Sequence, residues 1–308
     1  MSAVLKRLAG VVPVVFGVLL LTFLLVHLVP GDPVEVMLGE SATTADRTQL
    51  RTDLGLDKPL PAQFVGYLGK LAQGDFGRSI HTHAAIAGLL AERVPATARL
   101  ASLSLLIALL IALPLGIAAA LSHLRWPDRF ATLSALTLSA MPHFWLGPLL
   151  MLVFALWLGW LPVSGMESGA SIVLPALTLA CGLMAILTRM TRASMLEVLG
   201  EDFVRTARAK GLPESIVVLR HALKAALLPV VTVVGLQLGS LLAGAVITET
   251  IFGWEGVGRL LVESIEKRDY PVTQACVLVI ALTYVLVNLA TDLAYSRLDP
   301  RVRFEAAN

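Results

Sequence analysis

Residues 100–124 read LASLSLLIALLIALPLGIAAALSHL and contain no aspartate, glutamate, lysine or arginine. An α-helix rises about 1.5 Å per residue, so about 20 apolar residues are enough to cross the hydrocarbon core of a bilayer. Inside that core the backbone must satisfy its own hydrogen bonds, and a helix does so within one segment. This stretch therefore predicts a transmembrane helix.

The same pattern occurs six times along the chain. The runs that lack acidic, lysine and arginine residues and are long enough to span a bilayer are Leu8–Val29, Leu100–Leu124, Phe130–Met166, Ser168–Thr188, Ala225–Thr248 and Tyr270–Thr291. The third run is too long for one crossing, so we expect its helix at Ala131–Leu158. Membrane β-strands would show alternating segments of about ten residues, and this sequence has none. The predicted fold is an all-α membrane protein with six transmembrane helices.

The composition agrees with a lipid environment. Charged residues make up only 15% of the chain, against about 25% in a typical soluble domain. The formal net charge of +2 comes without a clustered basic face, so we expect no nucleic-acid partner. Cys181 and Cys276 both lie in apolar runs, which predicts buried free thiols rather than a disulfide framework.

The first apolar run resembles a signal peptide only in its flank, where Lys6 and Arg7 precede it. Its apolar core is too long for a signal peptide. Pro30-Gly31-Asp32-Pro33 follows it where a cleavage site of small residues would be expected. We therefore interpret this run as an uncleaved anchor.

The distribution of basic residues predicts the orientation. The loops on the side of the two termini carry fourteen lysine or arginine residues, whereas the opposite short loops carry only Arg259, Lys267 and Arg268. By the positive-inside rule both termini lie in the cytoplasm. The predicted organisation is an anchor helix at 1–30, an extracytoplasmic segment at 31–95, a transmembrane core at 96–297 with a cytoplasmic loop at 193–224, and a cytoplasmic tail at 298–308.

Motifs for catalysis are missing from the sequence. A phosphate-cradling G-x-x-x-x-G-K-[ST] loop is absent, since the pair Gly69-Lys70 is followed by Leu71. The sequence also lacks H-E-x-x-H and G-x-S-x-G, which argues against an intramembrane protease or a serine hydrolase. His81 and His83 have no third ligand nearby in the sequence, so we expect no metal site there. We predict that this chain is not an enzyme and holds no cofactor.

The cytoplasmic loop carries the most specific pattern. From Thr191 to Lys210 the residues favour a helix, and Gly211 is placed to end it in a left-handed cap. Pro213 and Glu214 suit the start of a second helix, which runs through His221. Such a helical hairpin could be a rigid knob for a cytoplasmic partner or a solvated amphipathic connector, and physical reasoning alone leaves both open.

A family resemblance favours the knob. The stretch EDFVRTARAKGL at 201–212, continued by RHAL at 220–223 and LLP at 227–229, resembles the signature loop of permease subunits of binding-protein-dependent ABC importers. It is most similar to the peptide and nickel branch, the group of the dipeptide and oligopeptide permeases DppB and OppB. Arg205 and Thr206 depart from the general motif in the manner of that branch, and only Ala207 and Gly211 match it position by position.

Further blocks extend the resemblance over nearly the whole chain. They are VHLVPGDP at 26–33, ETIFGWEGVGRL at 249–260, RDYP at 268–271 and LDPR at 298–301. The resemblance implies the transmembrane-domain fold of type I ABC importers and a place in the bacterial plasma membrane. It also implies that the loop docks on an ATPase subunit through Arg205, Thr206, Ala207, Lys210, Gly211, Leu212, Ser215 and His221.

The implied partners are a second, homologous permease subunit, two ATPase subunits that bind ATP and Mg, and an extracytoplasmic substrate-binding protein. The implied cargo is a dipeptide or short peptide, with oligopeptides, glutathione-like peptides, nickel complexes and haem as alternatives. No residue of the sequence stands out as a substrate ligand. A secondary transporter is the competing function, but it predicts an internal inverted repeat, and the two halves of this sequence do not match.

Overall fold

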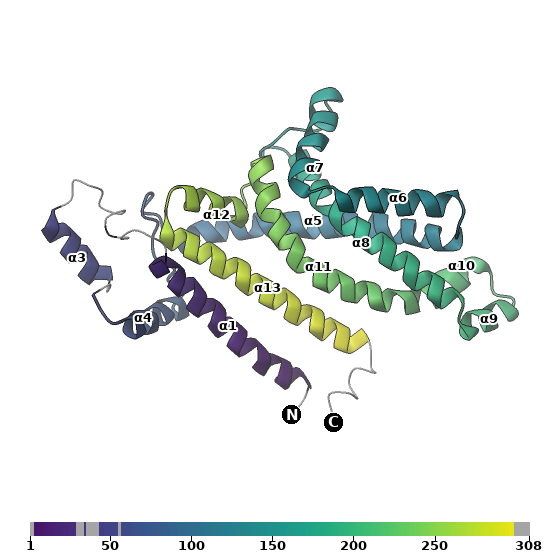
Figure 1. The fold of residues 1–308 in the computed structure, drawn as a ribbon, viewed down its shortest axis with the longest axis horizontal. Helices are drawn as coiled ribbons and strands as arrows, with labels where there is room; N and C mark the ends of the chain where they lie inside the picture. The colour runs from purple at the N-terminus through teal and green to yellow at the C-terminus, as the bar shows by residue number, and fades with distance from the viewer. Residues whose placement is uncertain (1–2, 29–33, 35–42, 55–56, 299–308) are drawn as a thin grey trace. The chain divides into compact units, whose positions relative to one another are not determined.

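The computed structural model describes residues 3–28, 34, 43–54 and 57–298, and the described chain is almost entirely helical (Figure 1). The predicted tail beyond Leu298 and the residues 29–33 after the first helix lie outside the described residues. The α-helices are α1 (Ala3–Leu28), α3 (Thr44–Leu54), α4 (Leu60–Ala72), α5 (Ile86–Leu121), α6 (Trp126–Ala140), α7 (His143–Leu150), α8 (Val173–Leu199), α9 (Asp202–Ala209), α10 (Glu214–Ile216), α11 (Leu223–Phe252), α12 (Val257–Glu266) and α13 (Tyr270–Leu298). A 3-10 turn at Gly169–Ile172 leads into α8, and π-helical turns at Met151–Trp157 and Val217–Ala222 follow α7 and α10.

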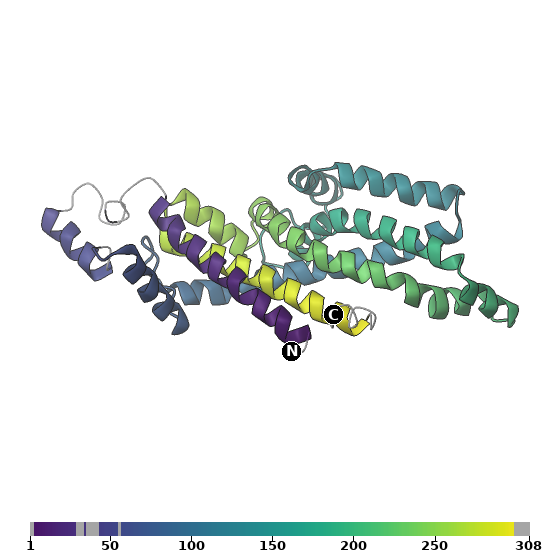
Figure 2. The ribbon, with the colours of Figure 1, turned by 60° about the horizontal axis from the view of Figure 1, so that its bottom comes forward.

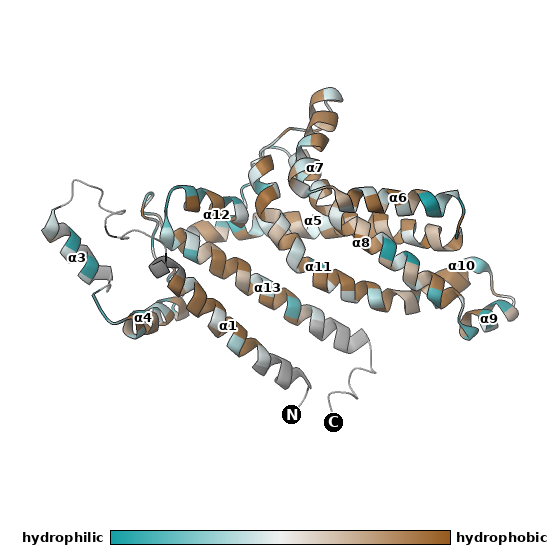
Figure 3. Ribbon diagram, in the orientation of Figure 1, coloured by the Kyte–Doolittle hydropathy of each residue, from teal (hydrophilic) through white to brown (hydrophobic). Residues whose placement is uncertain are grey.

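The helices lie where the apolar runs predict them. Among the described residues, four helical stretches are long and apolar enough to cross a membrane, namely Ile86–Leu121, Gly169–Leu199, Glu214–Phe252 and Tyr270–Thr291. They cover the predicted second, fourth, fifth and sixth spans. Helix α1 covers the first, with an apolar stretch at Gly10–Leu24. Apolar residues dominate α5 and α11 in Figure 3, whereas α3 and α9 are mostly polar.

The third span departs from the prediction. A single helix at Ala131–Leu158 is wrong, because α6 ends at Ala140 and the chain bends by 113° before it continues through Trp157. Pro142 explains the break, since proline has no N–H and disfavours helical geometry at the preceding residue. Met141 accordingly adopts extended backbone angles, with φ −87° and ψ 120°.

Contacts divide the chain into two compact units, and each is described by itself. The larger unit comprises 1–5, 98–254 and 286–308. In it α8 packs against both α6 and α11, and Figures 1 and 2 show α8 and α11 side by side. Gly116 of α5 lets α8 approach closely, because a Cβ at this position would lie 2.6 Å from the Cβ of Thr191. Small residues allow such close helix contacts in membranes.

The central core of this unit is built from α5, α8 and α11. Its buried members are Ala108, Ala112, Ala180, Leu183, Met184, Leu187, Val230 and Leu241. Alanine predominates on α5 and larger side chains on α8, so the two helices fit closely at this contact. The core thus joins three of the predicted spans.

The second unit comprises 6–97 and 255–285. Its core joins Ile86 and Leu90 at the start of α5 to Val257, Val272 and Cys276. Helix α5 therefore begins within the segment predicted to be extracytoplasmic, and the contact division falls between Thr97 and Ala98. The boundary at 95/96 stays a prediction.

Polar contacts hold the loop before α5 against the turn between α12 and α13. The hydroxyl of Ser79 donates to Asp269 Oδ2 over 2.5 Å, and both side chains are buried. His81 Nε2 lies 2.6 Å from the carbonyl oxygen of Lys267. Among the described residues no group of three or more His, Cys, Asp or Glu side chains could hold a metal ion. The interaction that the structure gives His81 is this backbone contact.

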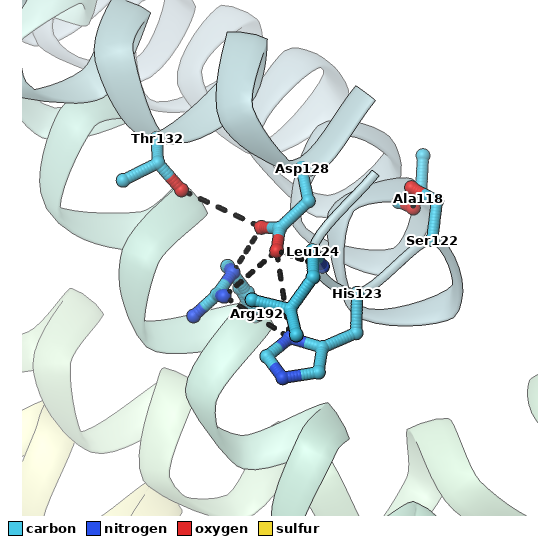
Figure 4. Close-up of polar contacts among 7 residues, drawn as sticks. All are labelled: Ala118, Ser122, His123, Leu124, Asp128, Thr132 and Arg192. Carbon is cyan, nitrogen blue, oxygen red and sulfur yellow. Dashed lines mark hydrogen bonds and ion pairs between the residues drawn. The ribbon is translucent and has the colours of Figure 1, made fainter. Parts of the chain in front are cut away.

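A buried ion pair joins the start of α6 to α8 (Figure 4). Asp128 is 3% exposed, and its carboxylate accepts hydrogen bonds from Nε and Nη2 of Arg192, the latter over 2.9 Å. The same carboxylate accepts a 2.8 Å bond from the backbone N–H of Leu124, and His123 Nδ1 lies 3.4 Å from Oδ2. The α5–α6 turn is thereby fixed to α8 shortly before α8 ends.

We predict that this pair stabilises the fold. Removing one partner of a buried ion pair leaves the other charge uncompensated, and Arg192 is only partly exposed, so Asp128→Asn and Arg192→Gln should each lower the free energy of unfolding by about 1–3 kcal/mol. The double variant should lose less than the sum. Denaturant or thermal unfolding in detergent micelles measures these losses.

The matched control is the exposed pair of Arg205 and Asp202, whose side chains are 71% and 95% exposed. Asp202→Asn should leave the unfolding transition where it is, because exposed ion pairs contribute little. Equal effects of Asp128→Asn and Asp202→Asn, or strictly additive losses in the double variant, would contradict a structural role for the buried pair.

Candidate functional site

The predicted docking loop forms a short helix beyond the ends of α8 and α11 (Figures 1 and 2). The predicted uninterrupted helix from Thr191 to Lys210 is wrong, because α8 ends at Leu199 and α9 begins at Asp202. Gly200 caps α8, and Glu201 has extended backbone angles of φ −71° and ψ 151°. Glycine weakens a helix at this point, since it has the greatest backbone freedom of any residue. The break lets α9 take its own direction.

Helix α9 is attached to the membrane helices through two small apolar side chains. Val204 and Ala207, three residues apart on one face, are buried, whereas the other side chains of α9 are exposed. They belong to a cluster with residues of α5, α8 and the segment that leads into α11. Its buried members are Ala120, Met195, Val204, Ala207, Val217, Val218, Ala222 and Ala226. Because close-packed cores transmit displacement rather than absorb it, we expect α9 to move with α8 and α11.

The turn after α9 has the predicted left-handed geometry. Gly211 has φ +77°, which confirms the predicted cap. A Cβ added at Gly211 would meet no atom within 4 Å, so only its backbone angle disfavours other residues. Across this turn the Arg208 guanidinium donates two hydrogen bonds to Glu214, over 3.1 Å and 2.6 Å. This bidentate pair ties α9 to α10.

Arg208 and Glu214 form an ion pair on the surface of the loop. The hydrogen bond from the guanidinium to the Glu214 carboxylate raises the pKa of Arg208 above its ordinary value, so this residue stays cationic at every physiological pH. Both side chains are exposed, so their interaction orients the loop rather than adding much stability.

The structure separates the eight predicted docking residues into three groups. The exposed group consists of Arg205, Thr206, Lys210, Gly211 and Ser215. Leu212 and His221 are half-buried. Ala207 is buried in the cluster, so it positions α9 and offers no side chain to a partner. The docking role of the whole set stays a prediction.

Sequence analysis missed the apolar side chains that the loop exposes. Phe203 on α9 is 44% exposed, and Ile216 and Leu219 are 40% and 60% exposed. An aromatic residue on the polar side of a short surface helix was the signal that could have singled out Phe203. Exposed aromatic side chains beside arginine are typical of protein–protein interfaces.

Comparison with protein families matches two descriptions to this chain. Residues 112–304 match the family described as "Binding-protein-dependent transport system inner membrane component". Residues 1–101 match the corresponding N-terminal family, "Binding-prot-dependent transport system membrane comp, N-term". The two matches together cover most of the sequence.

Curated relatives resemble the chain over its full length. The protein named "Glutathione transport system permease protein GsiC" of Salmonella typhimurium (strain LT2) is 44% identical over 305 residues, which is 99% of this chain and 100% of that protein. Its namesake in Pectobacterium atrosepticum is 45% identical over 301 residues, 98% of each chain. The Escherichia coli (strain K12) protein of the same name is 44% identical over 305 residues, again 99% of this chain and 100% of that protein.

Solved structures agree on the fold. An inward-facing form of the MetNI methionine ABC transporter matches with a TM-score of 0.59 at 17% identity, covering 68% of this chain and 96% of that chain. An amino acid ABC transporter matches with a TM-score of 0.51 at 17% identity, covering 70% and 94%. The predicted fold of a type I importer transmembrane domain is confirmed. The chain belongs to the family of inner-membrane permease components of binding-protein-dependent ABC importers.

Proposed function

We propose that this chain is the channel-forming permease subunit of an importer that moves dipeptides or other short peptides into the cytoplasm. Membership of the importer family supports the transport role, and relatives named for glutathione transport support a peptide cargo. Glutathione is a tripeptide, so it is the first cargo to test beside ordinary dipeptides. Oligopeptides, nickel complexes and haem remain the competing cargoes.

The proposed complex contains partners that supply what this chain lacks. Its sequence has no phosphate-cradling loop, so two separate ATPase subunits bind and hydrolyse ATP with Mg. A second, homologous permease subunit completes the channel. An extracytoplasmic binding protein delivers the cargo, and the family description "Binding-protein-dependent transport system" supports such a partner.

In this proposal α9 is the coupling helix. The observation that supports it is the attachment of α9 through Val204 and Ala207, which leaves Phe203, Arg205 and Lys210 exposed for a groove on an ATPase subunit. ATP binding can shift the permease between its inward-facing and outward-facing states only by its differential affinity for the two. A packed helix can deliver that free energy to α8 and α11, whereas a loosely attached loop would dissipate it.

Uptake by the assembled complex tests the proposed function. Vesicles that contain this chain, its partner permease, the ATPase subunits and the binding protein should accumulate labelled dipeptides or glutathione only when ATP is present. Vesicles with this chain alone should show no ATPase activity above a lipid control. ATP-driven uptake of haem or a nickel complex without uptake of any peptide would overturn the peptide assignment.

The proposed orientation puts both termini and α9 in the cytoplasm. Cysteines placed at Thr44 and Ser168 should react with an impermeant thiol reagent on intact cells, whereas a cysteine at Ser215 should react only after lysis. The native thiols of Cys181 and Cys276 are buried, and both are replaced first to remove background. Labelling of position 215 in sealed cells would reverse the orientation.

Gly211 should be critical for coupling. A left-handed backbone costs an ordinary L-residue about 1–2 kcal/mol, and valine adopts it with particular difficulty. Gly211→Val should therefore turn α9 out of its docking position and reduce both cargo uptake and cargo-stimulated ATPase activity of the complex at least about fivefold. Its level in the membrane should stay normal, because a Cβ at this position meets no other atom within 4 Å.

Gly211→Asn is the matched control, since asparagine tolerates the left-handed conformation. It should transport close to the wild-type rate. Wild-type transport by Gly211→Val would show that the geometry of this turn does not matter for coupling. Equal loss in both variants would mean that the side chain, rather than the backbone, causes the defect.

A further inference from the structure

A pocket of about 230 Å³ lies between the end of α6, α8 and α11 in the larger unit. Its lining includes Leu138, Ser139, Met141, Ile186, Gln237 and Ser240. The lining combines apolar walls with one amide and two hydroxyl groups, and it includes no charged residue. Few convergent polar groups in an apolar pocket are the usual composition of a site for a small molecule.

The pocket lies at the middle of the transmembrane helices. Gln237 is midway along α11 and Ile186 is midway along α8. Ser240 lies one turn after Gln237 on the same face of α11. In a membrane this position is near the centre of the hydrocarbon core, where a polar side chain is costly and is a candidate for function.

The polar groups of this pocket are not used by the fold. Neither Gln237 nor Ser240 makes a hydrogen bond to another residue of the described chain. The Ser139 hydroxyl donates to the carbonyl oxygen of Leu136 over 2.9 Å and keeps its own acceptor sites. Ser139 and Ser240 are exposed in this chain and Gln237 is half-buried, so the three polar side chains are open to a ligand that passes through.

The break between α6 and α7 forms the third wall. Leu138, Ser139 and Met141 line the pocket at the point where the chain leaves helical geometry. Backbone without helical hydrogen bonds is tolerated at membrane depth only where it is covered by protein or lines a cavity.

We propose that this pocket is the part of the cargo pathway that this chain contributes, and that it takes the neutral backbone amides of a peptide. The proposal rests on the proposed function. The Gln237 side chain has the same donor and acceptor groups as a peptide bond, so it can pair with an amide of any sequence. The absence of charged lining residues means that the termini and charged side chains of the cargo are bound elsewhere.

The size of the pocket supports a partial site. Pockets for whole drug-sized ligands have volumes of about 300–1,000 Å³, so about 230 Å³ holds a segment of a peptide rather than all of it. The partner permease would contact the remainder. A lipid acyl chain is a poorer occupant, because it offers no hydrogen bond to Gln237, Ser139 or Ser240.

The test compares cargo moved per ATP hydrolysed by the reconstituted complex. Gln237→Met keeps the volume and shape of the side chain and removes its hydrogen-bonding groups. It should lower peptide uptake per ATP about three- to tenfold, the loss expected for one or two hydrogen bonds to cargo. Leu236→Ala is the control, since Leu236 is the preceding residue of α11, is 69% exposed and does not line the pocket.

A second measurement detects the cargo directly. With Cys181 and Cys276 replaced, Ser240→Cys should be labelled by a small membrane-permeant thiol reagent, and peptide delivered by the binding protein should slow this labelling. Labelling of Leu236→Cys should not respond to peptide.

The outcomes separate the two proposals. If the wild-type complex imports no peptide, the proposed function fails. If it imports peptide while Gln237→Met keeps the wild-type ratio of uptake to ATP, the pocket is not the cargo site. Labelling of position 240 that ignores peptide, as a resident lipid would produce, overturns the pocket proposal as well.

Discussion

Helices in hydrocarbon gain little from burying apolar side chains against one another, so their association depends on close fit. In this chain α5, α8 and α11 meet that requirement at the core that contains Ala112, Leu187 and Val230, and at Gly116 the backbones come closest. The same helices continue beyond this contact into the cluster that holds α9 through Val204 and Ala207. Every proposed activity of the chain depends on this packed group, because it positions both the pocket and the docking helix.

The polar side chains of the membrane helices differ in whether other residues of the fold form hydrogen bonds with them. The Asp128 carboxylate accepts hydrogen bonds from Arg192 and from the backbone of Leu124, which is the arrangement of a structural ion pair. Gln237, in contrast, has no partner among the described residues and lines a cavity. A satisfied buried group stabilises one conformation, whereas the half-buried Gln237 side chain keeps its donor and acceptor groups open to a ligand. This difference assigns the first to the scaffold and the second to the cargo.

The sequence was informative where one segment determines its own structure. Runs without charged residues predict helices because the backbone in lipid has no other economical state, and Gly211 predicts its cap because left-handed geometry is local. The break after Ala140 could not be decided from Pro142, because proline is tolerated within membrane helices when neighbours satisfy the freed groups, so a kinked and a continuous helix were both open. The break at Gly200 was missed because its flanking residues are good helix formers.

Contacts between segments that are far apart in the chain could not be predicted from the sequence. Arg192 and Asp128 lie in different helices, α8 and α6, and nothing in their spacing along the sequence shows that they pair. The pocket combines residues of three helices, so neither Gln237 nor Ser139 could be recognised as its lining before the helices were placed. The burial of Ala207 belongs to this class too. Its match to the family motif suggested a docking residue, while its position in the cluster makes it an attachment point.

The two proposed sites share α8, and this sharing has a thermodynamic consequence. From Ile186 at the pocket to Leu199 at its end, α8 is an unbroken helix of about 20 Å. A displacement of the end of α8, against which α9 packs through Val204 and Ala207, therefore reaches the pocket along an unbroken helix. By linkage, if docking of the ATPase changes the affinity of the pocket for cargo, cargo changes the affinity for the ATPase by the same factor.

The pocket wall formed by α6 is interrupted, whereas the wall formed by α8 is continuous. Helix α6 is tied to α8 at its first turn by Asp128 and Arg192, but it ends at the break beside the pocket. At the bend the Met141 N–H donates to the carbonyl oxygen of Leu138 over 3.4 Å, which is a weak hydrogen bond, so the angles of this residue can change at low cost. We therefore expect motion of α8 to change the shape of the pocket at this junction, where the α6 wall is not continuous. A pocket with one rigid and one jointed wall can bind cargo in one state and release it in the other.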